Sequence, residues 1–157
     1  MLPLVFATLF MALTTTVWAR PMPSPSGNVG FQQEELNWYN EYRADHGLPA
    51  ASILDCANQL ASSVDWIQQA QVALANGDIN QNDVTTKGRE FCPDMPNASF
   101  HMIVSPSFDR GKIAFEPLME RGPGDLAAWT QVGFGVEVGT GASSSNMYSW
   151  SIVLVKP

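Results

Sequence analysis

The residues best suited to chemistry in this 157-residue chain are two histidines and two cysteines. A thiolate beside an imidazole is the arrangement of a cysteine nucleophile, so Cys56 or Cys92 with His101 would suit that chemistry. An even number of cysteines in an oxidising compartment favours a disulfide instead. A bridge between Cys56 and Cys92 would abolish the nucleophile. The sequence leaves both interpretations open and favours the bridge.

Other catalytic and binding motifs are missing from the sequence. There is no Gly-x-Ser-x-Gly elbow of a serine hydrolase. Gly133 and Gly135 lie in an expected strand with no helix after it, so they do not predict a phosphate-binding loop. Fifteen acidic residues against eight basic ones give a net charge of -7, and no Lys/Arg-rich run is present. This charge balance argues against nucleic acid as a partner.

The first 19 residues have the character of a secretory signal peptide. Residues 2–19 carry no charge, are apolar through Leu13 and end in the small residue Ala19, after which we expect cleavage. An uncleaved anchor is the alternative, but the segment is shorter than the about 20 predominantly apolar residues of a membrane span. We therefore expect a secreted, extracellular protein without a stable membrane span. Residues 20–30 are expected to be an unpacked Pro/Ser/Gly-rich leader, and residues 31–157 a single domain.

Two helices are predicted in the first half of this domain. The first covers residues 32–46 and ends at Gly47; its opening turn is acidic, with Glu34 and Glu35. The second runs from a cap at Asp55 or Ser52 to about Asn76. The inner faces are predicted from three- and four-residue spacing to be Leu36, Tyr39, Asn40 and Arg43 in the first helix, and Leu60, Val64, Ile67 and Leu74 in the second.

The second half of the domain predicts loops and strands. Residues 77–99 are rich in Asn, Asp, Thr, Gly and Pro and are expected to be mostly loop. Residues 100–105 predict a strand, and residues 122–124 predict a turn. Residues 112–115 predict either a strand or the start of a short helix that continues to Glu120. Residues 131–138 and 148–154 alternate between apolar and other residues, which predicts a half-buried β-hairpin. Helices followed by strands predict an α+β fold.

Residues 31–49, which read FQQEELNWYNEYRADHGLP, resemble the opening helix of the CAP superfamily (cysteine-rich secretory proteins, antigen 5 and pathogenesis-related 1). Residues 77–80 are similar to the family's turn after its second helix, and 129–132, WTQV, to its aromatic-Thr-Gln-Val piece. Residues 148–157 resemble its closing strand. The resemblance implies a three-layer α-β-α sandwich with a central antiparallel sheet. Asn40 and Arg43 are polar on an apolar face, so we expect them to be hydrogen-bonded to neighbouring loop carbonyls.

Many CAP proteins have a cleft of two His and two Glu that can hold zinc, and the resemblance indicates where those residues would fall here. Asp83 takes the place of the first His and Ala128 that of the second. Glu90 is the nearest match to the first Glu, and Glu116, favoured over Glu120, to the second. His101 is a replacement ligand or, more simply, a strand residue, and His46 the end of a helix. We therefore expect no zinc and no cofactor; carboxylates alone would hold calcium or magnesium only weakly.

These features predict a secreted CAP-like protein that acts by binding an apolar small molecule, such as a sterol or a fatty acid, or an extracellular protein. The alternatives are a secreted hydrolase that uses Glu90 and Glu116, and a small defence or effector protein that resembles the family only in its first helix. Asn97-Ala98-Ser99 matches the N-glycosylation acceptor sequence, although a three-residue match often arises by chance.

Overall fold

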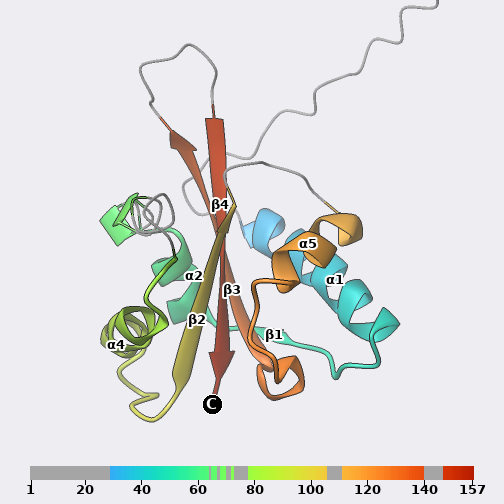
Figure 1. The fold of residues 1–157 in the computed structure, drawn as a ribbon, viewed down its shortest axis with the longest axis horizontal. Helices are drawn as coiled ribbons and strands as arrows, with labels where there is room; N and C mark the ends of the chain where they lie inside the picture. Colours follow the sequence, from blue (N-terminus) through green and yellow to red (C-terminus); the bar gives the residue numbers. More distant parts are fainter. Residues whose placement is uncertain are drawn as a thin grey trace, which may run out of the picture.

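The structure is an α+β fold in which a sheet lies between two layers of helices (Figure 1). The computed structural model describes residues 29–63, 65–66, 68–69, 72, 78–105, 111–139 and 147–157. The expected signal peptide and residues 20–28 of the expected leader lie outside these residues, as do Val64, Ile67 and Leu74. The three-layer architecture is the predicted one.

The sheet has four strands in the order β1-β3-β4-β2, shown edge-on in Figure 1. β4 pairs antiparallel with both β2 and β3, and the β3–β4 pair is the predicted hairpin. The expectation of a wholly antiparallel sheet was wrong in one place, because the short β1 runs parallel to β3. The strands are β1 (Ser52–Ile53), β2 (Ser99–Ser105), β3 (Gln131–Gly139) and β4 (Met147–Lys156).

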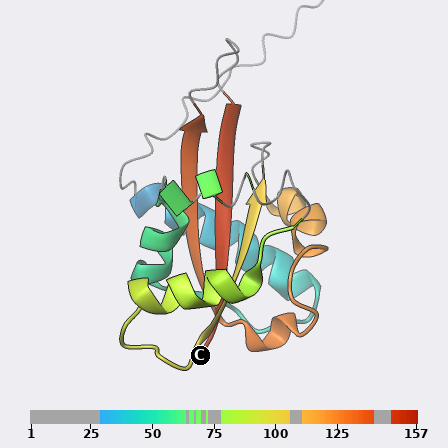
Figure 2. The same ribbon diagram turned by 60° about the vertical axis from the view of Figure 1, so that its left-hand side comes forward.

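Helices cover both faces of the sheet (Figure 2). One layer holds α1 (Val29–Asp45), the 3-10 turns η1 (Lys112–Ala114) and η2 (Leu126–Ala128), and α5 (Phe115–Met119). The other layer holds α2 (Asp55–Ala61) and α4 (Gln81–Phe91). Residues 112–119 are therefore helical, the second of the two predicted alternatives. None of the described helices combines the length and the apolar content that crossing a bilayer requires.

The two faces of the sheet contribute to separate hydrophobic cores. Because side chains alternate along a strand, Phe134, Trp150 and Ile152 face α1 and α5, whereas Met102, Val153 and Val155 face α2 and α4. All six side chains are almost completely buried. β4 is thus buried on both sides, which agrees with its central position in the sheet.

β3 approaches α2 closely at two glycines. A Cβ added to Gly133 would lie 2.2 Å from the backbone carbon of Ala57, and one added to Gly135 would lie 2.0 Å from the carbonyl oxygen of Ala61. The prediction of a half-buried strand was therefore wrong, because the glycine face of β3 packs directly against the α2 backbone. The glycines serve close packing between a helix and the sheet.

α4 occupies a segment that was predicted to be mostly loop. The Asn80 side chain caps the helix by accepting a hydrogen bond from the Asn82 backbone nitrogen at 3.0 Å. Of the helix, Val84 and Gly88 are buried, and Gly88 lies against the ring of Phe100. The prediction failed because the polar residues that suggested a loop form the exposed face of a helix with a narrow buried face.

Side chains of α4 also bind the outer edge of β2. The Gln81 side chain makes two hydrogen bonds to Met102, one to its backbone N–H at 3.0 Å and one to its carbonyl at 3.2 Å. The Thr85 hydroxyl makes the same two bonds to Phe100, at 3.1 and 3.0 Å. Arg89 Nε donates to the carbonyl of Ala98 at 3.1 Å. The three residues are four apart and therefore form one stripe of the helix. They satisfy backbone groups that a further strand would otherwise take up.

α1 and α2 begin differently from the prediction. Glu35 is not an exposed first-turn acid but fully buried, because the inner stripe of α1 is Phe31, Glu35, Tyr39, Tyr42 and Arg43.

α2 is preceded by Leu54 with no side-chain cap, so neither Asp55 nor Ser52 caps it. The predicted disulfide is present: Cys56 of α2 is bonded to Cys92, which ends α4.

We predict that Gly135→Ala destabilises the protein by about 1–3 kcal/mol, because the new methyl group meets backbone atoms that cannot rotate away. The measurement is the free energy of unfolding in urea. Gly124→Ala is the matched control, since nothing lies within 4 Å of its added Cβ. Equal stabilities of the two variants would contradict the close approach of α2 and β3.

Candidate functional site

Asn40 and Arg43 fix α1 to three other segments. Asn40 donates to the carbonyl of Ala51 at 3.0 Å and accepts from its N–H at 2.7 Å. The fully buried Arg43 donates to the carbonyls of Pro49, Leu126 and Trp129, at 2.5, 3.3 and 3.0 Å. Both side chains therefore bind backbone carbonyls of other segments, Arg43 from a fully buried and Asn40 from a partly buried position, which indicates a structural role.

The buried hydroxyl of Tyr39 belongs to the same network. Arg43 Nη1 lies 3.1 Å from the hydroxyl oxygen, and the guanidinium carbon lies 5.4 Å from the centre of the ring. Burial raises the pKa of Tyr39, and the charge of Arg43 opposes this shift. The hydroxyl is thus a neutral partner of the guanidinium.

His46 and Glu116, which the sequence did not relate to each other, lie together. His46 Nε2 is 3.3 Å from Glu116 Oε1, and Nδ1 is 2.8 Å from the carbonyl oxygen of Tyr42. The imidazole also contacts the Tyr42 ring in a tilted arrangement, with 4.2 Å between ring centres and 34° between the ring planes. The pair is exposed at the surface, with 39% of the His46 and 61% of the Glu116 side chain accessible to solvent.

Charged side chains of α1, η1 and α5 surround this pair. Lys112 Nζ lies 2.5 Å from Asp45 Oδ2 and is within electrostatic range of Glu41 and Glu116. The hydrogen bond and the charge of Lys112 lower the pKa of Asp45, and Asp45 in turn raises the pKa of Lys112. One lysine is thus paired with Asp45 and stabilised in its charged form by two further carboxylates, Glu41 and Glu116. We call the surface formed by Glu41, Asp45, His46, Lys112, Ile113 and Glu116 the α1–α5 surface.

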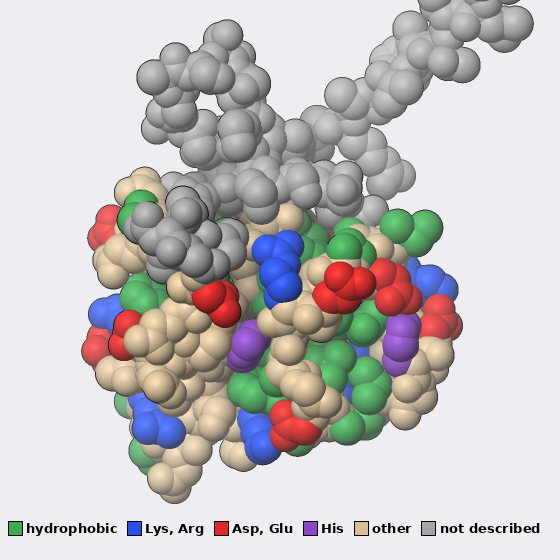
Figure 3. All heavy atoms as spheres, viewed as in Figure 1, with side chains coloured by type: hydrophobic (Ala, Val, Ile, Leu, Met, Phe, Trp, Pro, Cys, Tyr) green, Lys and Arg blue, Asp and Glu red, His purple; other side chains and the backbone are tan. Residues whose placement is uncertain are grey.

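His101 lies in β2, half-buried beside Trp129. Its Nε2 is 3.0 Å from the carbonyl oxygen of Arg121, which requires the proton on Nε2, and the two ring centres are 6.0 Å apart in an edge-on contact. Trp129 Nε1 donates to Asp125, which also pairs with Lys156. Burial lowers the pKa of His101, so its neutral form is favoured. Both histidines lie on the face seen in Figure 3, with hydrophobic side chains between them.

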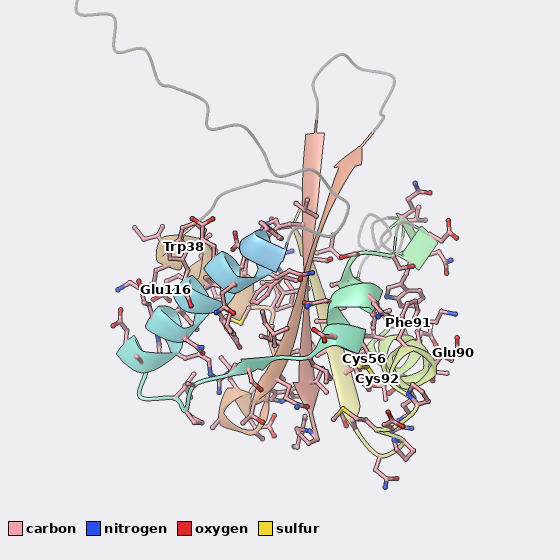
Figure 4. All side chains as sticks on the ribbon, turned by 180° about the vertical axis from the view of Figure 1, so that it is seen from behind. Trp38, Cys56, Glu90, Phe91, Cys92 and Glu116 are labelled. Carbon is pink, nitrogen blue, oxygen red and sulfur yellow. A yellow bond between two sulfur atoms is a disulfide. The ribbon has the colours of Figure 1, made fainter. Side chains whose placement is uncertain are left out.

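The remaining predicted cleft residues are distributed over the molecule. Asp83 and Glu90 are exposed on α4, where Glu90 pairs with Lys87 at 2.6 Å. Glu116 belongs to the layer on the other side of the sheet, as Figure 4 shows for the labelled Glu90 and Glu116. Ala128 lies in η2, partly buried against the core that contains Trp129. The expectation that these residues line one cleft was therefore wrong.

This separation argues against the hydrolase alternative in the form that uses Glu90 and Glu116 together. A pair of catalytic carboxylates must flank one bond, about 5–10 Å apart, whereas here the sheet lies between the two residues. Within the described residues, no three His, Cys, Asp or Glu side chains gather closely enough to hold a metal ion. Both cysteines are in the disulfide, so neither supplies a thiolate.

Comparison with known proteins adds no assignment: no protein-family model matches the chain, and no curated protein matches it. The resemblance to the CAP superfamily stays a prediction.

We predict that the stability of the protein falls as the pH drops below about 6.5, because the unfolded chain then takes up a proton on His101 that the folded state disfavours. Replacing His101 by Gln should flatten this dependence. The measurement is the urea midpoint between about pH 7.5 and 5. Asp45 and Asp125, whose pKa values are lowered, contribute only at lower pH. An unchanged slope in the variant would contradict the burial of His101.

Proposed function

We propose that this protein is a secreted, CAP-like binding protein that recognises a basic protein partner through the α1–α5 surface. The observation that carries the proposal is Ile113, which is 83% exposed in the 3-10 turn η1, directly before α5. Burial of this aliphatic side chain against a partner would be favourable.

The position of Ile113 is set by its neighbours. Lys112 before it is paired with Asp45 of α1, and Ala114 and Phe115 after it are buried in the core. The turn that carries Ile113 is therefore attached to the domain on both sides of this residue, and such attachment lowers the entropy lost on binding. This arrangement suits an anchor residue at the centre of a small interface.

The charges around Ile113 select the kind of partner. The α1–α5 surface contains three carboxylates, Glu41, Asp45 and Glu116, against Lys112 and the titratable His46, and the whole chain carries a net charge of -7. Opposite charge steers a partner to the surface and fixes its orientation. A partner segment with lysine or arginine around an apolar residue is complementary to this surface.

Three further observations support the CAP-like and secreted parts of the proposal. Asn40 and Arg43 of the resembling helix bind carbonyls of the segments after α1 and before β3, the other part of the chain that resembles the family. The element order gives the sandwich that the resemblance implies. The Cys56–Cys92 disulfide suits an oxidising compartment.

The test uses a peptide array in which Lys/Arg and Leu positions are varied together, with acidic peptides of the same apolar content as a comparison. We expect the chain to bind the basic apolar peptides, more weakly as salt is raised. Ile113→Asp should reduce the affinity about tenfold or more, because burial of an isoleucine contributes about 1.5–3 kcal/mol. Fluorescence polarisation measures the affinities.

Val72→Asp is the matched control, since Val72 is the other large aliphatic side chain found exposed in the described residues, at 62%. It should leave the affinity unchanged. A sterol or a fatty acid is the other ligand class that the resemblance implies. Sterol binding that Ile113→Asp leaves intact, without any preference for basic peptides, would contradict a protein-binding role for this surface.

A further inference from the structure

The loop between α4 and β2 presents Asn97 to solvent. Pro93, Asp94, Pro96 and Asn97 are all exposed in this connection. The loop starts at Cys92, which the disulfide ties to α2, and ends where Ser99 begins β2. Asn97 and Ser99 are the first and third residues of the only Asn-x-Ser/Thr sequence in the chain.

The residues around Asn97 are fixed although its own side chain is exposed. Ala98 is buried, with its N–H donating to the carbonyl of Met95 at 3.1 Å and its carbonyl accepting from Arg89 Nε at 3.1 Å. The N–H of Met95 donates to the carbonyl of Cys92 at 3.0 Å. These bonds hold the loop on the domain without involving the amide of Asn97.

The surroundings of Asn97 leave room for a large attached group. An oligosaccharide is bulky and hydrophilic and is tolerated only where it displaces no packed side chain. The exposed loop residues meet this condition, whereas Asn58, for example, is buried and bonded to the backbone nitrogen of Phe134. A group on Asn97 would extend from the domain into solvent.

We propose that Asn97 carries an N-linked oligosaccharide. In this transfer the Asn97 amide nitrogen bonds to the anomeric carbon of an oligosaccharide held on a lipid diphosphate. The bond from that carbon to the diphosphate oxygen breaks, the lipid diphosphate leaves, and the amide gives up one proton. The inference rests on the proposed secretion, because the transfer takes place in the secretory pathway.

The position of the loop determines which surface of the domain would stay accessible beside the oligosaccharide. The loop belongs to the side of the sheet that carries α4, whereas α1, η1 and α5 lie on the other side (Figure 1). The oligosaccharide would therefore shield the start of β2 and leave the α1–α5 surface accessible. Glycosylation and the proposed partner binding are compatible.

The test is expression of the full chain in a eukaryotic secretory host, followed by intact-mass measurement of the protein in the medium. We expect a mass above that of the polypeptide, which peptide-N-glycosidase removes. Asn97→Gln and Ser99→Ala should both abolish the excess mass, and Ser99→Thr should keep it. Because Ser99→Ala retains Asn97, it separates loss of the acceptor sequence from loss of the asparagine.

A second version of the chain carries the host's own signal sequence in place of residues 1–19. If only this version is secreted and glycosylated, the native signal prediction fails and the glycosylation site stands. Secreted protein with the bare polypeptide mass in both versions would overturn the proposal for Asn97. So would an excess mass that persists in Asn97→Gln.

Discussion

The buried guanidinium of Arg43 is the contact on which the arrangement of α1 depends. It donates to carbonyls from the segment after α1, from η2 and from Trp129, which lies two residues before β3, and it lies against the ring of Tyr39. No carboxylate within the described residues pairs with it. A buried charge is costly unless its donors are hydrogen-bonded. The carbonyls and the Tyr39 hydroxyl satisfy Nε and Nη1, whereas Nη2 has no hydrogen-bond partner among the described residues, so losing any of these carbonyls would leave further donors of Arg43 unsatisfied. α1 and the surface it forms with α5 are thereby held on the sheet.

The sheet itself has little surface left for function. Its faces are covered by two helical layers, its glycines lie against the α2 backbone, and the outer edge of β2 is bonded by three side chains of α4. A partner of the proposed kind would therefore contact the outer sides of the helices and the loops. This is why the proposed binding surface lies on α1, η1 and α5, and the proposed glycan on the loop after α4.

The sequence predicted the elements whose signal is local. Alternation identified β3 and β4, helical spacing identified α1, and the even number of cysteines identified the disulfide. Its predictions failed where tertiary contacts determine the structure. α4 has few apolar residues and is bonded by its side chains to β2, and Glu35 is buried on the same stripe of α1 as Phe31 and Tyr39. The prediction of a shared cleft failed for the same reason, since spacing along the chain does not show that the sheet separates Glu90 from Glu116. The proximity of His46 to Glu116 depends on the packing of α5 against α1, which no motif indicates.

The most direct test of this account is the unfolding free energy of Arg43→Lys, with Arg121→Lys as the control at an exposed arginine. Lysine keeps the charge but cannot reach several carbonyls from one planar group. Hydrogen bonds to charged groups contribute about 1.5–3 kcal/mol each, so we predict a loss of about 3 kcal/mol or more in Arg43→Lys, against less than about 0.5 kcal/mol in the control. Equal stability of the two variants would contradict the role assigned to Arg43.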